Sequence, residues 1–116
     1  KNQTIIDIIV TNLKQIFDSF QIILATSTNS NDLALNDVAN RHNINFFSGD
    51  EHNVLKRFID CGEKFNAKII IRICADNPFI IPEYILPLIN TLKKENLEYC
   101  SSDCLESFVY LPVYLN

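Results

Sequence analysis

The 116-residue chain has only two glycines, Gly49 and Gly62, and it has no methionine and no tryptophan. Because glycines are so few, the chain has no glycine-rich loop of the kind that cradles a phosphate group. It has no apolar run close to the about 20 residues that a membrane helix needs. Its first residues lack the apolar stretch of a signal peptide. We therefore expect no membrane partner and place the protein in the cytoplasm.

An excess of positive charge is also missing. The net charge is −4, from 14 acidic and 10 basic residues, and the lysines and arginines are scattered along the chain. A surface that binds nucleic acid needs clustered basic side chains, so the sequence argues against a nucleic-acid partner. An acidic protein that binds a polyphosphate needs a metal ion or a local basic loop to offset the repulsion between like charges.

The composition is that of a globular protein, since 47% of the residues are hydrophobic and 21% are charged. Residues 1–116 are enough for a single domain with one core. The chain begins without Met, and its first segment looks like a helix that already needs a sheet to pack on. We therefore expect an incomplete domain that lacks an N-terminal piece.

The four cysteines are best explained as buried free thiols. Cys61 falls in a helical pattern and Cys74 ends an apolar strand. The spacing of Cys100 and Cys104 leaves half of a zinc site open as an alternative, although no paired histidine accompanies it. Disulfides are not expected in the cytoplasm.

Helical and strand patterns alternate along the chain. Apolar residues at intervals of three and four predict helices over residues 4–20, 30–42, 54–66 and 82–92. Continuous apolar runs predict strands over residues 21–26, 44–47, 68–74 and 97–100. Thr4 and Asp7 resemble a capping pair at the first helix. The alternation predicts an α/β fold with a mostly parallel sheet and helices on both faces.

Several hydrophobic residues are expected to face inward from these helices. The first helix carries one stripe of Ile5, Ile9, Leu13, Ile16, Phe17 and Phe20. In the second helix Leu35 and Val38 face inward, and the third helix carries a stripe of Val54, Leu55, Phe58, Ile59 and Phe65. These assignments follow from the three-to-four spacing of the apolar residues.

Three polar loops follow the predicted strands, at residues 26–28, 48–53 and 76–78. Right-handed crossovers bring the carboxyl ends of parallel strands to one edge of the sheet, where ligands bind in open α/β folds. The pattern therefore places hydroxyl, carboxylate, amide and imidazole groups along one rim.

Asp76 is the leading candidate among them, because it follows the strongest strand and Pro78 stiffens its turn. A carboxylate there suits Mg²⁺, which takes one or two protein carboxylates and completes its shell with phosphate and water. The alternative, that Asp76 only closes a turn, stays open.

The arginines near this rim also allow two interpretations. Asn53 and Arg57 lie one helical turn apart, so they face either a bound anion or solvent. Arg72 lies within an apolar strand, where it must pair with a phosphate or with an acidic neighbour. His52 is interpreted as an exposed loop residue.

Three blocks carry a resemblance to a known family. They are residues 23–27 (ILATS), 46–58 (FFSGDEHNVLKRF) and 70–80 (IIRICADNPFI). Together they resemble the cytidylyltransferases of the spore-coat polysaccharide synthesis type, related to the acylneuraminate and deoxy-octulosonate cytidylyltransferases. The resemblance covers roughly residues 4–100 and implies a Rossmann-like, three-layer α/β/α domain of the nucleotide-diphospho-sugar transferase type.

The resemblance also implies a reaction, in which CMP passes from CTP to a sugar hydroxyl and pyrophosphate is released. CTP and a sugar acceptor would be the partners, and Mg²⁺ the cofactor. Asp76 would bind the magnesium, and Arg72 would support its loop in catalysis. The nucleotide-binding residues would be Thr26, Ser27, Asn53 and Arg57. Monomer and homodimer are both compatible with the resemblance.

The chain departs from the family at several positions. The basic, glycine-containing loop that holds the triphosphate is absent, Ala75 replaces an expected glycine, and Ile81 stands where an acidic residue is common. The family's second acidic metal ligand cannot be located in residues 105–116. We therefore expect the fragment to be inactive and the intact protein to be a Mg²⁺-dependent enzyme of surface polysaccharide synthesis. A degenerate sugar-nucleotide binding module and a glycosyltransferase of similar topology are the alternatives.

Overall fold

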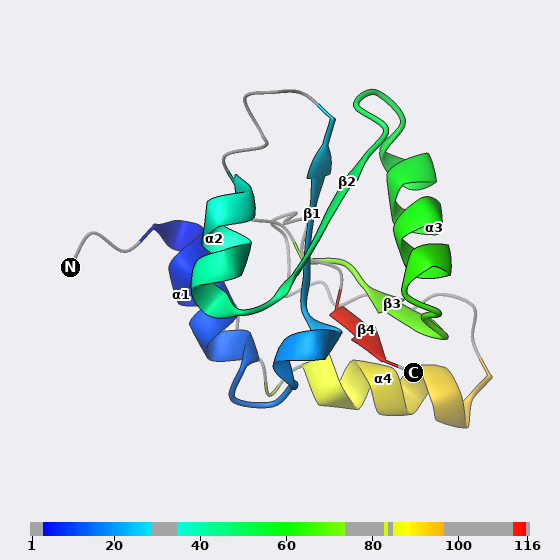
Figure 1. Cartoon of the computed structure of the whole chain (residues 1–116). Coiled ribbons are helices and arrows are strands. Elements are labelled where there is room, and N and C mark those ends of the chain that lie inside the picture. The colour runs from blue at the N-terminus through cyan, green and yellow to red at the C-terminus, as the bar shows by residue number, and fades with distance from the viewer. Residues whose placement is uncertain (1–3, 29–34, 74–82, 84, 97–112, 116) are drawn as a thin grey trace.

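The computed structural model describes residues 4–28, 35–73, 83, 85–96 and 113–115. They form helices α1, α2, α3 and α4, the 3₁₀ turn η1, and strands β1 to β4 (Figure 1). In chain order the elements are α1 (Ile5–Leu13), η1 (Ser19–Gln21), β1 (Ile23–Ser27), α2 (Leu35–His42), β2 (Asn45–Gly49), α3 (Val54–Lys64), β3 (Ile69–Ile71), α4 (Ile85–Lys94) and β4 (Val113–Leu115). The strand predicted at residues 97–100 lies outside the described residues, as do Cys74, Cys100 and Cys104.

The strands form two pairs. β1 and β2 are parallel, with a register that runs from Ile23 opposite Asn45 to Ser27 opposite Gly49. β3 pairs with β4 in the antiparallel direction, an arrangement that the sequence did not predict. The fold is a mixed α/β structure with a parallel sheet, as expected for a Rossmann-like nucleotidyltransferase domain.

Helices cover both faces of the parallel pair, which confirms the predicted layering (Figure 1). Side chains alternate between the faces of β1. Ile22 and Leu24 pack with α1, α2 and α4 in the larger core cluster. Ile23 and Ala25 face α3, where they pack with Cys61, a buried free thiol. All five residues of β1 are buried, so a continuous apolar run was the correct signal for this strand.

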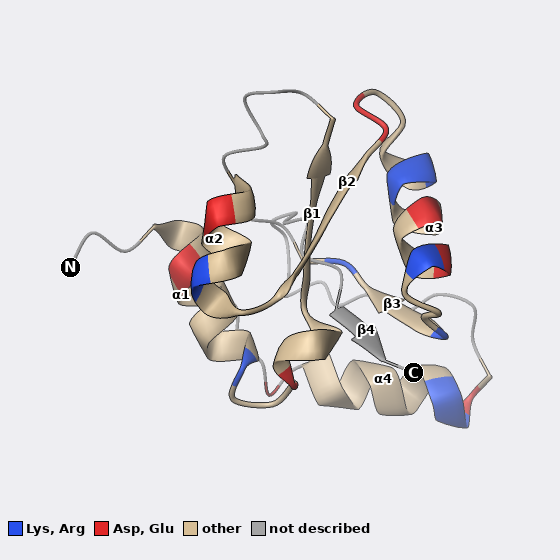
Figure 2. Cartoon of the chain, viewed as in Figure 1, with Lys and Arg blue, Asp and Glu red and all other residues tan. Residues whose placement is uncertain are grey.

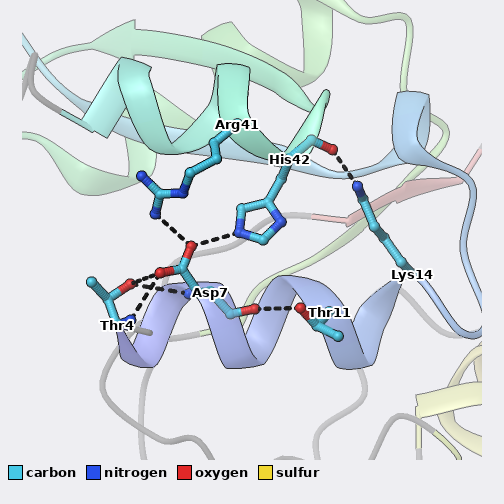
Figure 3. A network of polar contacts seen from close by, with 6 residues as sticks. All are labelled: Thr4, Asp7, Thr11, Lys14, Arg41 and His42. Carbon is cyan, nitrogen blue, oxygen red and sulfur yellow. Dashed lines mark hydrogen bonds and ion pairs between the residues drawn. The ribbon is translucent and has the colours of Figure 1, made fainter. Parts of the chain in front are cut away.

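A buried carboxylate joins α1 to α2 (Figure 3). Asp7 is 4% exposed and forms the predicted capping box with Thr4. Its Oδ1 also lies 2.6 Å from Arg41 Nη2 and 2.6 Å from His42 Nε2. Lys14 Nζ donates to the carbonyl oxygen of His42 and adds a second link between the two helices.

These contacts keep Asp7 ionised. The backbone N–H of Thr4 holds the pKa of the Asp7 carboxyl well below its usual range, and the Arg41 and His42 side chains lower the pKa further. Burial opposes this shift, because a buried charge loses its hydration. The hydrogen bonds outweigh that cost, so Asp7 acts as a charged tie between α1 and α2.

Asparagines in the left-handed conformation follow three of the helices. Asn43 (φ 56°) follows α2, Asn66 (φ 58°) lies just beyond α3, and Asn96 (φ 53°) lies just beyond α4. After α3, Asn66 N donates to Glu63 O (3.3 Å) and Ala67 N donates to Gly62 O (2.9 Å). This pair of bonds is the Schellman motif, which satisfies the last carbonyl groups of a helix. Asparagine takes the place of the usual glycine because it tolerates positive φ better than most residues.

The first helix is shorter than the sequence predicted. α1 ends at Leu13, and the chain tightens there, since Ile16 N donates to Leu13 O (3.1 Å). A second capping box, between Asp18 and Gln21, then begins η1. The assignment of Ile5 and Phe20 to the core was wrong, because their side chains are 43% and 65% exposed.

The inward assignment of Leu55 and Ile59 in α3 was also wrong. Leu55 is 70% exposed and Ile59 is 47% exposed. α3 packs on β1 through Cys61, and Phe58 is its other large buried side chain, so the buried stripe is narrower than the apolar spacing suggests. The exposed pair borders a surface hollow that Ile70 of β3 also lines.

Candidate active site at the carboxyl ends of the parallel strands

The carboxyl ends of β1 and β2 lie side by side, because the two strands are parallel and in register. Thr26 pairs with Ser48 and Ser27 with Gly49. Thr26 and Ser27 are 6% and 5% exposed. Ser48 Oγ donates to the carbonyl oxygen of Ser27 at 2.9 Å. The rim predicted from the sequence therefore exists at these two strands, and its hydroxyl groups are held in place by the sheet.

The loop after β2 is closed by one acidic side chain. Asp50 Oδ1 accepts hydrogen bonds from the backbone N–H groups of Asn53 (2.8 Å) and His52 (3.0 Å). These two bonds lower the pKa of the Asp50 carboxyl, the bond from Asn53 having the larger effect. The Asp50 carboxylate thus fixes the turn that leads into α3.

Arg57 holds the same loop from the other side. Its Nε donates to the carbonyl oxygen of Asp50 at 2.9 Å, and its Nη2 donates to the carbonyl oxygen of Glu51 at 3.1 Å. The side chain is half-buried. The Arg57 side chain therefore reaches from α3 back to the loop that follows β2.

Gly49 leaves the space through which Arg57 passes. A Cβ atom at Gly49 would lie 2.9 Å from Arg57 Cγ and 2.6 Å from a ring carbon of Phe47. Both distances are shorter than real Cβ atoms allow, so a larger residue would displace one of these side chains. The role of Gly49 was not predicted, because its contact with Arg57, eight residues along the chain, gives no local sequence signal.

The four predicted nucleotide-binding residues come from this one edge of the sheet. Thr26 and Ser27 end β1, and Asn53 and Arg57 flank the start of α3. The side chain of Asn53 caps α3, accepting a hydrogen bond from Lys56 N at 3.0 Å. Both Asn53 and Arg57 thus contact the protein's own backbone, and their role toward a nucleotide stays a prediction.

Arg72 lies just beyond the strand in which it was predicted. β3 ends at Ile71, so Arg72 follows the strand instead of lying within it, and its side chain is exposed. The guanidinium group lies over the ring of Phe58, with 5.2 Å between its central carbon and the ring centroid. Such a cation–π contact stabilises the charge without burying it. Asp76, the predicted magnesium ligand, lies outside the described residues.

Charge at this edge is mixed. Figure 2 shows the acidic segment at the tip of the loop between β2 and α3, beside the alternating basic and acidic residues of α3. Lys56 pairs with Asp60 at 2.6 Å along the helix, a bond that raises the pKa of Lys56. Within the described part of the chain, no group of three His, Cys, Asp or Glu side chains is placed to hold a metal ion.

A match to a known protein family identifies the kind of protein to which this edge of the sheet belongs. The sequence profile of the family described as Cytidylyltransferase matches residues 1–108. The chain belongs to the cytidylyltransferase family. This confirms the resemblance seen in the three sequence blocks, two of which form the edge described above.

Two curated relatives of this cytidylyltransferase-family chain are similar over most of its length. An uncharacterized protein of Methanocaldococcus jannaschii, MJ1063, is 32% identical over 101 residues, which cover 87% of this chain and 42% of the relative. The spore coat polysaccharide biosynthesis protein SpsF of Bacillus subtilis is 29% identical over 99 residues, or 82% of this chain and 41% of the relative. The chain thus spans about two fifths of the length of these relatives.

No solved structure matches the chain significantly. Among the described residues, no helix is both long enough and apolar enough to span a membrane.

Proposed function

We propose that the natural full-length protein is a cytoplasmic cytidylyltransferase that transfers CMP from CTP to a sugar. In this reaction the oxygen of a sugar hydroxyl forms a bond to the α-phosphorus of CTP. The bond to the outer two phosphates breaks, pyrophosphate leaves, and the hydroxyl proton is released. The observation that supports the proposal most is the family match over residues 1–108, because it covers both loops that frame the rim.

The geometry supports a ligand site at this rim. Ligands of open α/β sheets bind beyond the carboxyl ends of the strands, where Thr26 and Ser27 end β1. The loop at Asp50 and Glu51 carries negative charge, which would repel a triphosphate. A bound divalent cation would offset that repulsion.

We propose Mg²⁺ as this cation and Asp76 as its protein ligand. Magnesium needs only one or two carboxylates, because phosphate and water complete its shell, so a single carboxylate fits the metal's chemistry. When bound, the ion would stabilise the charge that develops on the phosphate oxygens. Arg72, beside Phe58, would support the chain that leads from β3 to Asp76.

A role in surface polysaccharide synthesis is the further part of the proposal. It rests on the name of the Bacillus subtilis relative, a spore coat polysaccharide biosynthesis protein. The acceptor would be a sugar that is activated as its CMP derivative before it is joined to a glycan.

The test is pyrophosphate release by the full-length protein with CTP, Mg²⁺ and a panel of sugars. We expect release with at least one sugar, and we expect Asp76→Asn to lower turnover by about 100-fold or more, since removal of one charge-stabilising group has effects of this size. Asp37→Asn, an exposed carboxylate on α2, is the matched control. Full activity in Asp76→Asn would remove the metal assignment. Failure with every sugar in the panel would favour a binding module without catalysis.

A further inference from the structure

Arg57 has the contacts of a residue that shapes a loop. Both of its observed hydrogen bonds go to backbone carbonyl oxygens, those of Asp50 and Glu51. These carbonyls belong to the loop of residues 50–53, at the edge where ligands of α/β sheets bind. We propose that Arg57 is a positioning residue for the transfer reaction, which acts by holding this loop and not by direct contact with the nucleotide. The inference rests on the proposed function.

The loop is held from two sides at once. Arg57 binds two of its carbonyl groups, and the Asp50 carboxylate binds the N–H groups of His52 and Asn53. The loop therefore has its shape before any substrate arrives. Glu51 and His52 are exposed on it, so their side chains are presented at the rim from a fixed backbone. A site that is ordered in advance pays less entropy when it binds.

Gly49 also helps to hold the loop, because it leaves space for the Arg57 side chain. A Cβ atom at this position would lie only 2.9 Å from Arg57 Cγ, and glycine avoids this contact. Gly49 has no positive φ, so the close approach of Arg57 and Phe47, and not backbone conformation, accounts for glycine here. A side chain at Gly49 would therefore press on both Arg57 and the Phe47 ring without altering any charged group.

The forked shape of the Arg57 guanidinium group, and not its charge alone, is what holds the loop. Nε and Nη2 form a rigid fork that reaches two carbonyl groups at once, whereas the lysine ammonium is a single point of charge. Arg57→Lys keeps the charge and loses the fork, and Arg57→Gln loses both. A positioning role predicts that the two variants fail to the same extent. A direct bond to phosphate predicts that lysine restores most of the activity.

The experiment measures kcat and KM for CTP in the full-length protein with Mg²⁺ and an accepted sugar. We expect Arg57→Lys and Arg57→Gln to lower kcat/KM by about 10- to 100-fold, as misplacement of a site element does. Gly49→Ala should also lower kcat/KM, because its Cβ would displace the Arg57 side chain or the Phe47 ring beside it. Lys56→Gln, at the preceding position of α3, should leave the kinetics unchanged. Recovery of activity in Arg57→Lys would overturn the proposal.

Amide hydrogen exchange separates this inference from the proposed function. The amides of His52 and Asn53 should exchange several-fold faster in the Arg57 and Gly49 variants, while those of β1 stay protected and report an intact fold. Unchanged exchange in the loop would overturn the positioning role, whatever the activity. If the wild type releases no pyrophosphate but the loop amides respond as expected, the proposed function fails and the assignment of Arg57 to the loop is supported.

Discussion

At the scale of single residues, Asp7 is the most heavily bonded ionisable side chain among the described residues. It combines the capping box of α1 with bonds to Arg41 and His42 of α2. The Thr4 partner was predicted from the sequence, because the two residues are three positions apart. The α2 partners lie 34 and 35 positions away. Only the packing of α1 on α2 brings them within reach.

We predict that Asp7 makes stability depend on acid pH. Because its pKa is lowered in the folded state, the unfolded chain takes up a proton first as the pH falls, so the stabilisation is complete above about pH 4 and is lost below it. Asp7→Asn should lower the free energy of unfolding at pH 7 by about 2 kcal/mol, the usual value of hydrogen bonds to a charged group. Urea unfolding between pH 2 and pH 7 measures both effects.

The control for this prediction is Asp37→Asn, which changes an exposed carboxylate in the first turn of α2. It should leave the stability at pH 7 within about 0.5 kcal/mol of the wild type, as most surface changes do. If Asp7→Asn retained the full acid dependence of the wild type, the charged tie between α1 and α2 would be disproved.

At the scale of the elements, helix ends are built from asparagine instead of glycine. The Schellman bonds after α3 require Asn66 at φ 58°. Asn66→Ala should destabilise the protein by about 1 kcal/mol, because a Cβ without a compensating polar group is strained in the left-handed region. Asn66→Gly should have little effect, since glycine adopts this conformation freely. Chemical unfolding of the purified variants measures the difference.

Asn40→Ala is the matched control for this prediction. Asn40 is exposed and lies within α2, where alanine is the better helix former. The change should therefore be neutral or slightly stabilising. Equal losses in Asn40→Ala and Asn66→Ala would show that conformation at the helix end is not the cause.

At the scale of the whole molecule, the sheet and its helices decide which apolar residues carry stability. Leu24 is 2% exposed in the larger core cluster, whereas Leu55 is 70% exposed on α3. Leu24→Ala should cost about 3 kcal/mol, from lost burial and the cavity left behind. Leu55→Ala should cost less than about 0.5 kcal/mol. Thermal or urea unfolding compares the two, and a large loss in Leu55→Ala would mean that this face of α3 is buried in solution.

Catalysis is also a property of the whole molecule. The chain covers about two fifths of the length of its curated relatives, so catalysis is proposed for the full-length protein. The part seen here supplies the carboxyl ends of two parallel strands and a loop held by Asp50 and Arg57. The proposed metal ligand, Asp76, follows β3 outside the described residues.

Local patterns predicted much of this structure. The apolar run of β1, the capping pair at α1 and the buried Cys61 all depend on neighbours in the chain, and each was predicted correctly. The end of α1 was missed because Ile16 and Phe17 keep helical spacing although the backbone tightens after Leu13. Leu55 and Ile59 were misplaced because spacing shows a stripe but not its width.

The sequence by itself determined the family, the alternation of helices and strands, and the edge at which polar residues gather. These follow from periodicity and from motifs whose residues lie close together in the chain. Only the tertiary structure decided that Arg57 turns back onto the loop of Asp50 and Glu51, that Gly49 leaves room for it, and that Arg72 rests on Phe58. Each depends on a distance between side chains that the packing of α3 against the strands sets, and no spacing along the chain encodes such a distance.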